Sequence, residues 1–243
     1  VNKMENREKQ KVPNVELKEL VNNELKAVSS RTLFDNRRVV VFSLPGAFTP
    51  TCSSSHLPRY DELAPIFGKE GVDEIVCLSV NDAFTMSAWA RDQDVRNVRL
   101  LADGNGEFTD GMGMLVDKSG LGFGRRSWRY SMLVVDGVVE KMFIEPEVEG
   151  DPFEVSDAET MLHYLNSDVV IPEAVTIITR EGCGHCSRAK VMLAQNGQPY
   201  QELVLGRDLS NAALQGLAGT QTVPQIFVGG KLVGGADDLA AAA

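Results

Sequence analysis

The sequence predicts an α/β protein made of two compact units, each with a central mixed β-sheet flanked by helices. Short apolar runs alternate with amphipathic segments along most of the 243 residues. A polar break that contains a proline, "NSDVVIPEA" at 166–174, is followed by a fresh alternation of strand and helix. The length also suggests one large domain or two, at roughly 150 residues per domain. We therefore expect a first domain at 1–167, a linker at 168–173 and a second domain at 174–243.

The first domain is expected to contain buried strands and helices with polar N-caps. Strands are expected where apolar residues dominate, at 39–44, 74–80 and on both sides of the hairpin signal Asp136-Gly137. Helices are expected to begin near Cys52 and to cover 82–93 and 156–165. Asn81 or Asp82 would start the second of these helices. Ser156 and Glu159 have the spacing of a capping box at the start of the third.

The second domain repeats this alternation on a smaller scale. Its first strand is expected at 175–180, and a helix should run from Cys183 to about Asn196, where Gly197 ends it. Further elements are expected in the order strand, helix and hairpin, at 200–205, 210–218 and 224–235.

Composition excludes several classes of partner. The net charge of −10 argues against nucleic acid and anionic membranes. No apolar run reaches the roughly 18 residues of a membrane-spanning helix, and the first residues lack the apolar core of a signal peptide. We therefore expect a cytoplasmic location. In that compartment cysteines are usually catalytic, metal-binding or buried.

The segment Cys183-Gly-His-Cys186 follows a predicted strand and opens a predicted helix, which is the setting of a redox-active C-x-x-C motif. The backbone N–H groups of the helix start would stabilise a thiolate at Cys183. Cys186 lies one turn further on, within reach of a disulfide. Half of a zinc site is the alternative, but no second C-x-x-C and no H-x-x-H accompanies this one. We expect no bound metal.

Three segments around this motif, "TREGCGHC", "TQTVPQIFVGG" and "LVGGADDL", resemble glutaredoxins over about 173–243. The Gly184-His185 pair departs from the Pro and aromatic residue usual in that family. The resemblance implies that Pro224 is cis and faces the dithiol, and that Arg180 meets a glutathione carboxylate. The full glutathione site that it implies is Arg180, Thr222, Val223, Pro224, Gly235, Ala236 and Asp237.

Cys52 lies in the polar, turn-forming segment "SLPGAFTPTCSSSH". Cys77, by contrast, lies in the apolar run "EIVCLSV" and is expected to be an inert core residue. The spacing of Pro45, Thr49 and Cys52 resembles the P-x-x-x-T-x-x-C motif of peroxiredoxins, and the resemblance covers about 12–167. "NDAF", "DGNGEFT" and "RRSWRYSMLV" resemble the atypical branch that occurs fused to glutaredoxin.

This resemblance implies two thioredoxin-like domains and a peroxide-reducing site in the first. Cys52 would react with peroxide, Thr49 would bind it, Pro45 would complete the motif, and Arg129 would complete the site. The residue types agree with that chemistry. A free thiol with a pKa of about 8.5 is only a few per cent ionised at neutral pH. Full ionisation raises the thiolate population only about thirtyfold, so most of the rate must come from orienting the peroxide and stabilising the departing oxygen.

Other candidate residues are better explained by packing or solvent exposure than by catalysis or ligand binding. Arg125 and Arg126 are expected to be a solvated pair. The glycines of "GLGFGR" precede a strand instead of opening a helix, so they do not indicate a dinucleotide site. His56 is expected to pack or to donate and accept hydrogen bonds, because a thiolate that is already ionised needs no base.

The sequence therefore predicts a glutathione-dependent thiol peroxidase for hydrogen peroxide and organic hydroperoxides. The sulfenic acid formed at Cys52 needs a second thiol, and 147–156 contains no cysteine, so glutathione is the expected reducing co-substrate, with no bound cofactor. Two alternatives stay open: a redox sensor that relays oxidation to a partner protein, and a general thiol-disulfide oxidoreductase. We expect a homo-oligomer, either a dimer or a tetramer.

Overall fold

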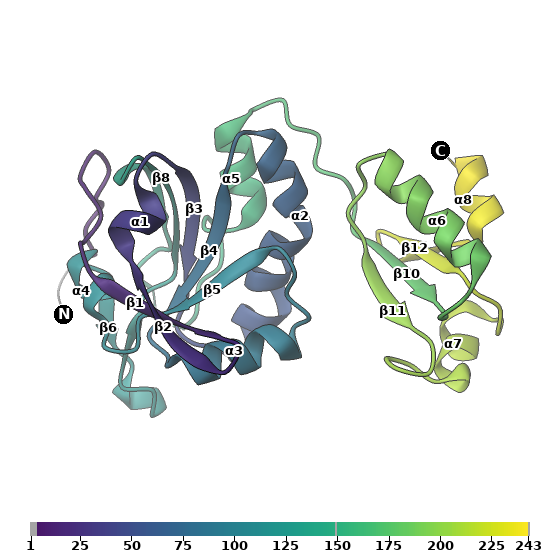
Figure 1. The fold of residues 1–243 in the computed structure, drawn as a ribbon, viewed down its shortest axis with the longest axis horizontal. Coiled ribbons are helices and arrows are strands. Elements are labelled where there is room, and N and C mark those ends of the chain that lie inside the picture. Colours follow the sequence, from purple (N-terminus) through teal and green to yellow (C-terminus); the bar gives the residue numbers. More distant parts are fainter. Residues whose placement is uncertain (1–3, 149, 243) are drawn as a thin grey trace. The chain divides into compact units, whose positions relative to one another are not determined.

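The computed structural model describes residues 4–148 and 150–242 and divides the chain into two units, Val1–Val169 and Val170–Ala243 (Figure 1). Each unit has its own sheet and its own core, so each is described by itself. Among the described residues, no helix has the length and apolar character needed to cross a bilayer.

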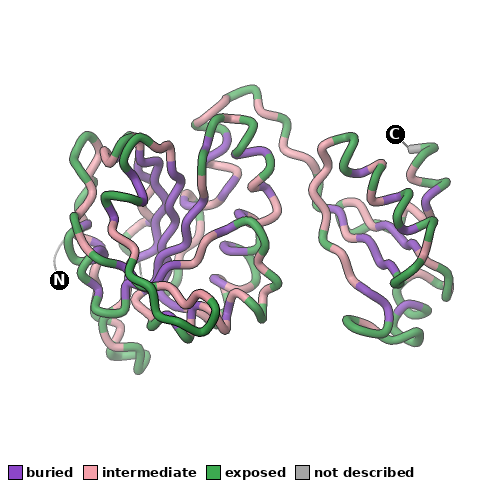
Figure 2. The backbone as a smooth tube through the Cα atoms, viewed as in Figure 1, coloured by how far each residue is buried: buried purple, intermediate pink, exposed green. Residues whose placement is uncertain are grey.

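The first unit is built on a seven-stranded mixed sheet with the strand order β2-β1-β5-β4-β3-β8-β9. Its strands are β1 (Glu16–Val21), β2 (Glu24–Ser29), β3 (Arg38–Ser43), β4 (Glu74–Ser79), β5 (Val98–Ala102), β8 (Tyr130–Val135) and β9 (Val138–Ile144). The central strands β3, β4 and β5 are parallel, whereas β8 is antiparallel to β3. A separate two-stranded ladder joins β6 (Leu115–Asp117) to β7 (Arg125–Ser127). Parallel strands are covered on both faces, which explains why β3 and β4 are almost continuously apolar and buried (Figure 2).

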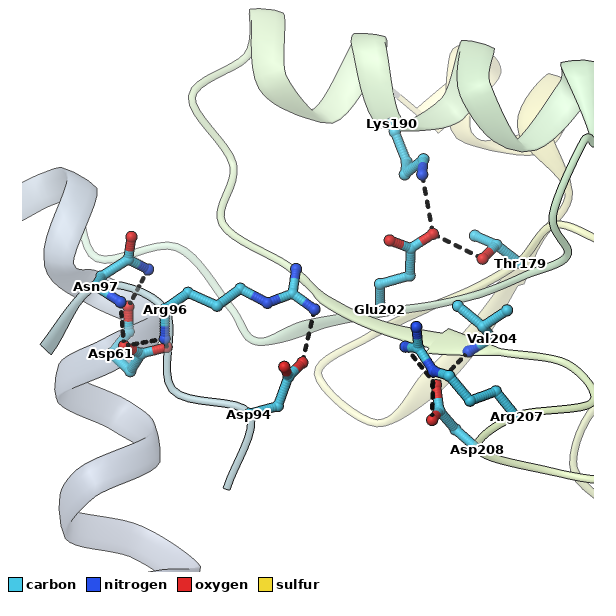
Figure 3. Close-up of polar contacts among 10 residues, drawn as sticks. All are labelled: Asp61, Asp94, Arg96, Asn97, Thr179, Lys190, Glu202, Val204, Arg207 and Asp208. Carbon is cyan, nitrogen blue, oxygen red and sulfur yellow. Dashed lines mark hydrogen bonds and ion pairs between the residues drawn. The ribbon is translucent and has the colours of Figure 1, made fainter. Parts of the chain in front are cut away.

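The helical segments of this unit are α1 (Ser30–Phe34), the π-helix η1 (Cys52–His56), α2 (Leu57–Lys69), α3 (Ala83–Asp92), α4 (Glu107–Gly111), the 3₁₀-helix η2 (Ser119–Leu121) and α5 (Ala158–Leu165). Helix α2 continues η1 directly and is tied to the start of β5. The Asp61 carboxylate on α2 accepts hydrogen bonds from the backbone N–H groups of Arg96 and Asn97 (Figure 3). It also accepts from the N–H of Val98. This fixed helix carries the Cys52 turn at its N-terminal end.

Most predicted elements of the first unit are confirmed. Strands β3, β4, β8 and β9 cover the expected segments, and Asp136-Gly137 makes the β8–β9 turn with φ values of 49° and 72°. Asp82 caps α3 by accepting from the Thr85 N–H. The predicted capping box at Ser156 is wrong. Asp157 caps α5 instead, because the Ser156 hydroxyl donates to the buried Glu145 carboxylate.

The hairpin β1–β2 was not predicted, although its turn carries a recognisable signal. Asn22 and Asn23 have φ values of 53° and 63°, and this conformation is the one required in a two-residue hairpin turn. Asparagine tolerates it better than most residues. The Asn-Asn pair between two short alternating segments could therefore have indicated the hairpin.

The second unit has a four-stranded mixed sheet with the order β11-β10-β12-β13. Its elements are β10 (Val175–Thr179), α6 (Gly184–Gln195), β11 (Gln201–Val204), α7 (Asn211–Ala218), β12 (Gln225–Val228), β13 (Lys231–Gly234) and α8 (Ala236–Ala242). Glu202 on β11 joins two neighbours, because its Oε1 accepts from the Thr179 hydroxyl at 2.7 Å and from Lys190 Nζ at 2.9 Å (Figure 3). This contact ties α6 to the sheet. The predicted order of strands and helices in this unit is confirmed.

Candidate functional site

Cys52 begins the π-helix η1, between the loop that follows β3 and the long helix α2. A π-turn is rare and is frequently found at functional sites. Cys52 and His56, at the two ends of η1, are both 0% exposed. Both side chains contact the same residue, Arg129. The widened turn therefore places a buried thiol and a buried imidazole in one polar cluster.

Arg129 is the centre of this cluster. It lies between β7 and β8, and it is 1% exposed. Its Nη2 lies 3.4 Å from Cys52 Sγ, and its Nη1 lies 3.0 Å from His56 Nδ1. Nη2 also lies 2.6 Å from both carboxylate oxygens of Asp151. Burial opposes the charged form of Arg129, but attraction to Cys52 and to Asp151 outweighs it and raises the pKa of the guanidinium.

His56 supports the guanidinium and is not ionised. Burial, and next the positive charge of Arg129, lower the pKa of His56 well below its ordinary value. Its Nε2 lies 3.1 Å from the carbonyl oxygen of Ser156. Its ring also packs against Phe42 and Phe153, at 4.7 and 4.9 Å between ring centroids. His56 is thus a packing and hydrogen-bonding histidine, as the sequence indicated.

The predicted residues Pro45 and Thr49 lie in the loop between β3 and η1. Pro45 is buried and Thr49 is half-buried. The Thr49 hydroxyl donates to the Gly46 carbonyl at 2.8 Å, and within the described residues it makes no hydrogen bond to Cys52 or Arg129. Asn81, in the bend after β4, holds this loop, because its Oδ1 accepts from the Ala47 N–H at 3.0 Å. The structure therefore places Thr49 on the turn that leads to Cys52, with its hydroxyl engaged locally.

Glu145, immediately after β9, organises the segment that carries Asp151 and Phe153. It is 1% exposed, and its carboxylate accepts from the backbone N–H groups of Glu154, Val155 and Ser156. The Ser156 hydroxyl donates to the same carboxylate at 2.7 Å. Nothing in the local sequence indicated Asp151 or Glu145 as site residues, since Asp151 meets Arg129 across 22 residues and the partners of Glu145 lie nine to eleven residues away.

Two tryptophans donate hydrogen bonds to residues that flank the site. The Trp89 indole on α3 donates to the hydroxyl of Ser53, next to Cys52, at 3.0 Å. The Trp128 indole donates to the Glu145 carbonyl at 2.9 Å. Both contacts fix segments that flank Cys52 and Asp151.

The remaining candidates of the first unit lie outside the polar cluster or are inert. Cys77 is fully buried, and burial raises the pKa of its thiol well above the ordinary value. Arg125 is exposed, in line with the prediction for it. Arg126 is not simply solvated, because it donates to the carbonyls of Val80 and Phe123. Among the described residues there is no group of three or more His, Cys, Asp or Glu placed to hold a metal ion.

The dithiol of the second unit lies at the start of α6. Cys183 is the N-cap residue, and its sulfur accepts from the Cys186 N–H at 3.2 Å. The two sulfurs are bonded to each other as a disulfide. Cys183 Sγ lies 3.8 Å from the carbonyl oxygen of Val223, and the Val223–Pro224 peptide bond is cis. The loop before β12 therefore lies against the dithiol.

A concavity of about 250 Å³ lies beside this loop. It is lined by six of the residues that the resemblance implied, namely Thr222, Val223, Pro224, Gly235, Ala236 and Asp237, together with His185, Arg188, Gln225 and Asp238. Arg188 forms an ion pair with Asp237. Arg180 does not line this concavity. It lines another one, where its Nη2 lies 3.4 Å from Asn211 Oδ1. The cation that the structure places among the other predicted residues is Arg188, which the sequence did not indicate.

Comparison with known proteins agrees with this two-unit organisation. The Redoxin family model matches residues 7–162, and the Glutaredoxin family model matches residues 175–233. The chain is 55% identical over 236 residues to hybrid peroxiredoxin hyPrx5 of Haemophilus influenzae, which covers 97% of this chain and 98% of that protein. It is 62% identical over 141 residues to peroxiredoxin sll1621 of Synechocystis, covering 56% of this chain and 75% of that one.

Solved structures resemble the first unit. Reduced Prx3 of Vibrio vulnificus in complex with H₂O₂ is 42% identical and covers 65% of this chain and 98% of its own, with a TM-score of 0.62. The antioxidant protein of Plasmodium falciparum, a 1-Cys peroxiredoxin, is 35% identical and covers 66% of this chain and 99% of its own, with a TM-score of 0.64. Because a hybrid relative aligns with almost the whole chain and each unit matches its own family, this chain belongs to the peroxiredoxins fused to a glutaredoxin domain, which are thiol-based peroxidases.

Proposed function

We propose that the chain is a glutathione-dependent peroxidase in which Cys52 reduces hydrogen peroxide and organic hydroperoxides and the Cys183–Cys186 dithiol returns Cys52 to the thiol state. The observation that carries this proposal is the contact between buried Cys52 Sγ and Arg129 Nη2 at 3.4 Å. A thiolate beside a fixed guanidinium is stabilised by an opposite charge in a site with little water. The Haemophilus influenzae relative is named a hybrid peroxiredoxin and aligns with 97% of this chain.

In the first step the Cys52 thiolate attacks one peroxide oxygen. An S–O bond forms, the O–O bond breaks, and its electron pair leaves with the second oxygen, which takes up a proton to become water or an alcohol. The products are the Cys52 sulfenic acid and the reduced peroxide. Arg129 would stabilise the charge that develops on the departing oxygen. Its Nε has no hydrogen-bond partner among the described residues, so this buried donor is not already engaged.

Thr49 would orient the peroxide beside Cys52, with Pro45 shaping the turn. In the structure its hydroxyl donates to the Gly46 carbonyl, and its oxygen retains lone pairs that could accept a hydrogen bond from a peroxide. Asn81 anchors the same turn through the Ala47 N–H. Positioning of this kind contributes more to the rate than ionisation of the thiol does.

In the second step glutathione reduces the sulfenic acid. Its thiol forms a disulfide with Cys52 and a water molecule leaves. Cys183 then attacks the glutathione sulfur of this mixed disulfide, which releases the Cys52 thiolate. A second glutathione removes the first from Cys183 as glutathione disulfide. The balance is one peroxide and two glutathione molecules consumed for one glutathione disulfide formed.

The concavity beside Cys183 would hold glutathione during this exchange. Val223 offers backbone groups next to the dithiol, and the polar rim supplies Thr222, Arg188 and Asp237. Because Arg180 lines a different concavity, Arg188 is the better placed cation for a glutathione carboxylate. Fusion would raise the effective concentration of the dithiol at Cys52. Such a thiol-driven cycle suits the reducing cytoplasm.

The test is a steady-state assay of the full chain with glutathione and, in turn, hydrogen peroxide, tert-butyl hydroperoxide and cumene hydroperoxide. We expect one glutathione disulfide to form for each peroxide molecule consumed. Turnover with dithiothreitol but not with glutathione would refute the glutathione dependence alone. No turnover with any thiol would refute the peroxidase cycle. Accumulation of a disulfide-linked partner protein, without turnover, would support the redox-sensor alternative.

A mixture of two inactive variants tests whether the thiol exchange occurs within one chain or between two chains. Cys52→Ser chains retain the dithiol and Cys183→Ser chains retain the peroxide-reacting thiol. If the mixture recovers turnover, the exchange runs between chains. If it does not, the exchange runs within one chain.

A further inference from the structure

Asp151 is a carboxylate that contacts the Cys52 site without belonging to any motif that predicted it. It lies in the segment between β9 and α5, and its side chain is 39% exposed. Both of its oxygens lie 2.6 Å from Arg129 Nη2. The guanidinium on the other side of this ion pair is 1% exposed. An ion pair between two exposed side chains usually contributes little energy, because water screens it. In this pair the guanidinium is buried, so the interaction is screened less.

The carboxylate and the Cys52 sulfur share a single nitrogen. Nη2 of Arg129 lies 3.4 Å from Sγ and 2.6 Å from each oxygen of Asp151. Arginine and carboxylate commonly form a fork of two N–H···O bonds that uses two nitrogens. Here both oxygens use Nη2, and the buried Nε has no partner among the described residues. The two hydrogens of Nη2 must therefore serve both the carboxylate and the sulfur.

We propose that Asp151 is a positioning residue that restrains the ionisation of Cys52 by competing with the thiolate for Arg129 Nη2. The proposal deepens the proposed function, because it assumes that the thiolate of Cys52 is the reacting species. Two anions that share one donor each receive less stabilisation than a single anion would. The carboxylate would thus set the pH range over which Cys52 is reactive.

The groups that face Cys52 come from four elements. Arg129 precedes β8, His56 ends η1, Asp151 lies after β9, and Cys77 lies on β4. His56 is kept neutral by burial and by Arg129, and Cys77 is kept neutral by burial. Arg129 and Asp151 are therefore the two charged side chains of this group near neutral pH. Removal of the carboxylate leaves the Arg129 guanidinium as the one charged side chain of this group beside Cys52.

The test compares Asp151→Asn, Asp151→Ala and the wild-type full chain. The rate of alkylation of Cys52 by iodoacetamide is measured against pH on the Cys52 peptide by mass spectrometry. We expect the midpoint of this profile to move to lower pH by about one unit in both variants, because an adjacent opposite charge shifts ionisation by about one to three units and Asp151 takes up part of that effect. Glu154→Gln is the control, since Glu154 is an exposed carboxylate three residues further along the same segment. It should leave the midpoint unchanged.

Arg129→Met tests whether Asp151 acts through the guanidinium. In that background Asp151→Asn should move the midpoint by much less than one unit. An equal movement would mean direct repulsion of the sulfur and would overturn the shared-nitrogen explanation. A midpoint that does not move in Asp151→Asn, or that moves as far in Glu154→Gln, would overturn the proposal entirely. Alkylation needs neither peroxide nor glutathione, so this result is independent of the proposed peroxidase cycle.

Discussion

The contact between Arg129 and His56 determines the protonation of the histidine. Nη1 of Arg129 lies 3.0 Å from His56 Nδ1, and a guanidinium nitrogen can only donate a hydrogen bond. Nδ1 therefore accepts, and the ring hydrogen is on Nε2, which donates to the Ser156 carbonyl at 3.1 Å. A second proton on this ring would face the guanidinium directly. His56 is consequently a neutral support that holds Arg129 beside Cys52.

Folding stability should depend on pH through His56. Burial and Arg129 lower the pKa of His56 well below its ordinary value of 6.5. Below about pH 6.5 the unfolded chain therefore binds a proton that the folded chain does not, so stability is fully present above this pH and falls as the pH decreases. The expected slope is up to about 1.4 kcal/mol per pH unit. Urea denaturation of the first domain, scored by limited proteolysis at several pH values, measures it.

His56→Gln removes the titrating ring and should flatten this slope below about pH 6.5. His163→Gln is the matched control, because His163 is exposed and lies in the same unit. A slope that is equally steep in His56→Gln would show that another group causes the acid sensitivity.

Cys52→Ser should abolish peroxide consumption while the second domain still reduces glutathione-linked disulfides, because the two thiol sites occupy separate units. The two activities are measured on the same preparation. Cys77→Ala should keep peroxide consumption, since the Cys77 thiol is buried and its pKa is raised by burial. Peroxide turnover that persists in Cys52→Ser would contradict the assignment of the nucleophile.

Arg129→Met should slow oxidation of Cys52 by about a hundredfold or more, the usual cost of removing a donor that stabilises developing negative charge. Loss of thiolate alone accounts for at most about thirtyfold. Single-turnover rates, measured at a pH where the thiol is ionised, separate the two effects. Arg126→Met is the control, because Arg126 binds the Val80 and Phe123 carbonyls instead. If Arg129→Met reacts at the native rate, Arg126 becomes the first alternative.

Cys183→Ser should stop turnover with glutathione but leave the first oxidation of Cys52 intact. Cys183 caps α6 and is placed to attack, whereas Cys186 is buried one turn further on. Exchange with a glutathione mixed disulfide needs only one attacking sulfur. Cys186→Ser should therefore keep substantial turnover. Equal loss in both variants would mean that the internal disulfide is an obligatory intermediate.

Glu145→Gln should lower the free energy of unfolding of the first domain by about 1–3 kcal/mol. The carboxylate accepts three backbone N–H groups and one hydroxyl, and an amide would place N–H groups against some of these donors. Urea denaturation measures the loss. Glu154→Gln, at an exposed position of the same segment, should change stability little.

Local patterns predicted the elements but not the side-chain partners that complete the site. Apolar runs and the Asp136-Gly137 turn were sufficient to place β3, β4, β8 and β9, because each depends on neighbours in sequence. Asp151 meets Arg129 across 22 residues, and Arg129 meets Cys52 across 77, so that Arg129 was indicated only by the family resemblance and Asp151 not at all. No periodicity reports such contacts. The Ser156 capping box failed for the same reason, since a buried carboxylate eleven residues earlier takes the Ser156 hydroxyl.

In the second unit, too, the sequence motifs did not specify every side chain that lines the concavity beside the dithiol. The resemblance to glutaredoxins indicated six residues that line this concavity, and it also indicated Arg180, which lines another one. Arg188 lies on α6, two residues after Cys186, and helical geometry turns it toward Asp237. Which of the two arginines meets a glutathione carboxylate stays a prediction, because a motif does not specify the direction of a side chain.

The positions of the two tryptophans make intrinsic fluorescence a probe of the first unit. Trp89 and Trp128 are the only tryptophans in the sequence, and both lie in the first unit. One indole is anchored on the residue next to Cys52, and the other on the carbonyl of Glu145. Intrinsic emission therefore reports rearrangements around Cys52, while exchange at Cys183 and Cys186 contributes no tryptophan signal of its own. Stopped-flow fluorescence can thus time the peroxide step separately from the thiol exchange that follows, without any label.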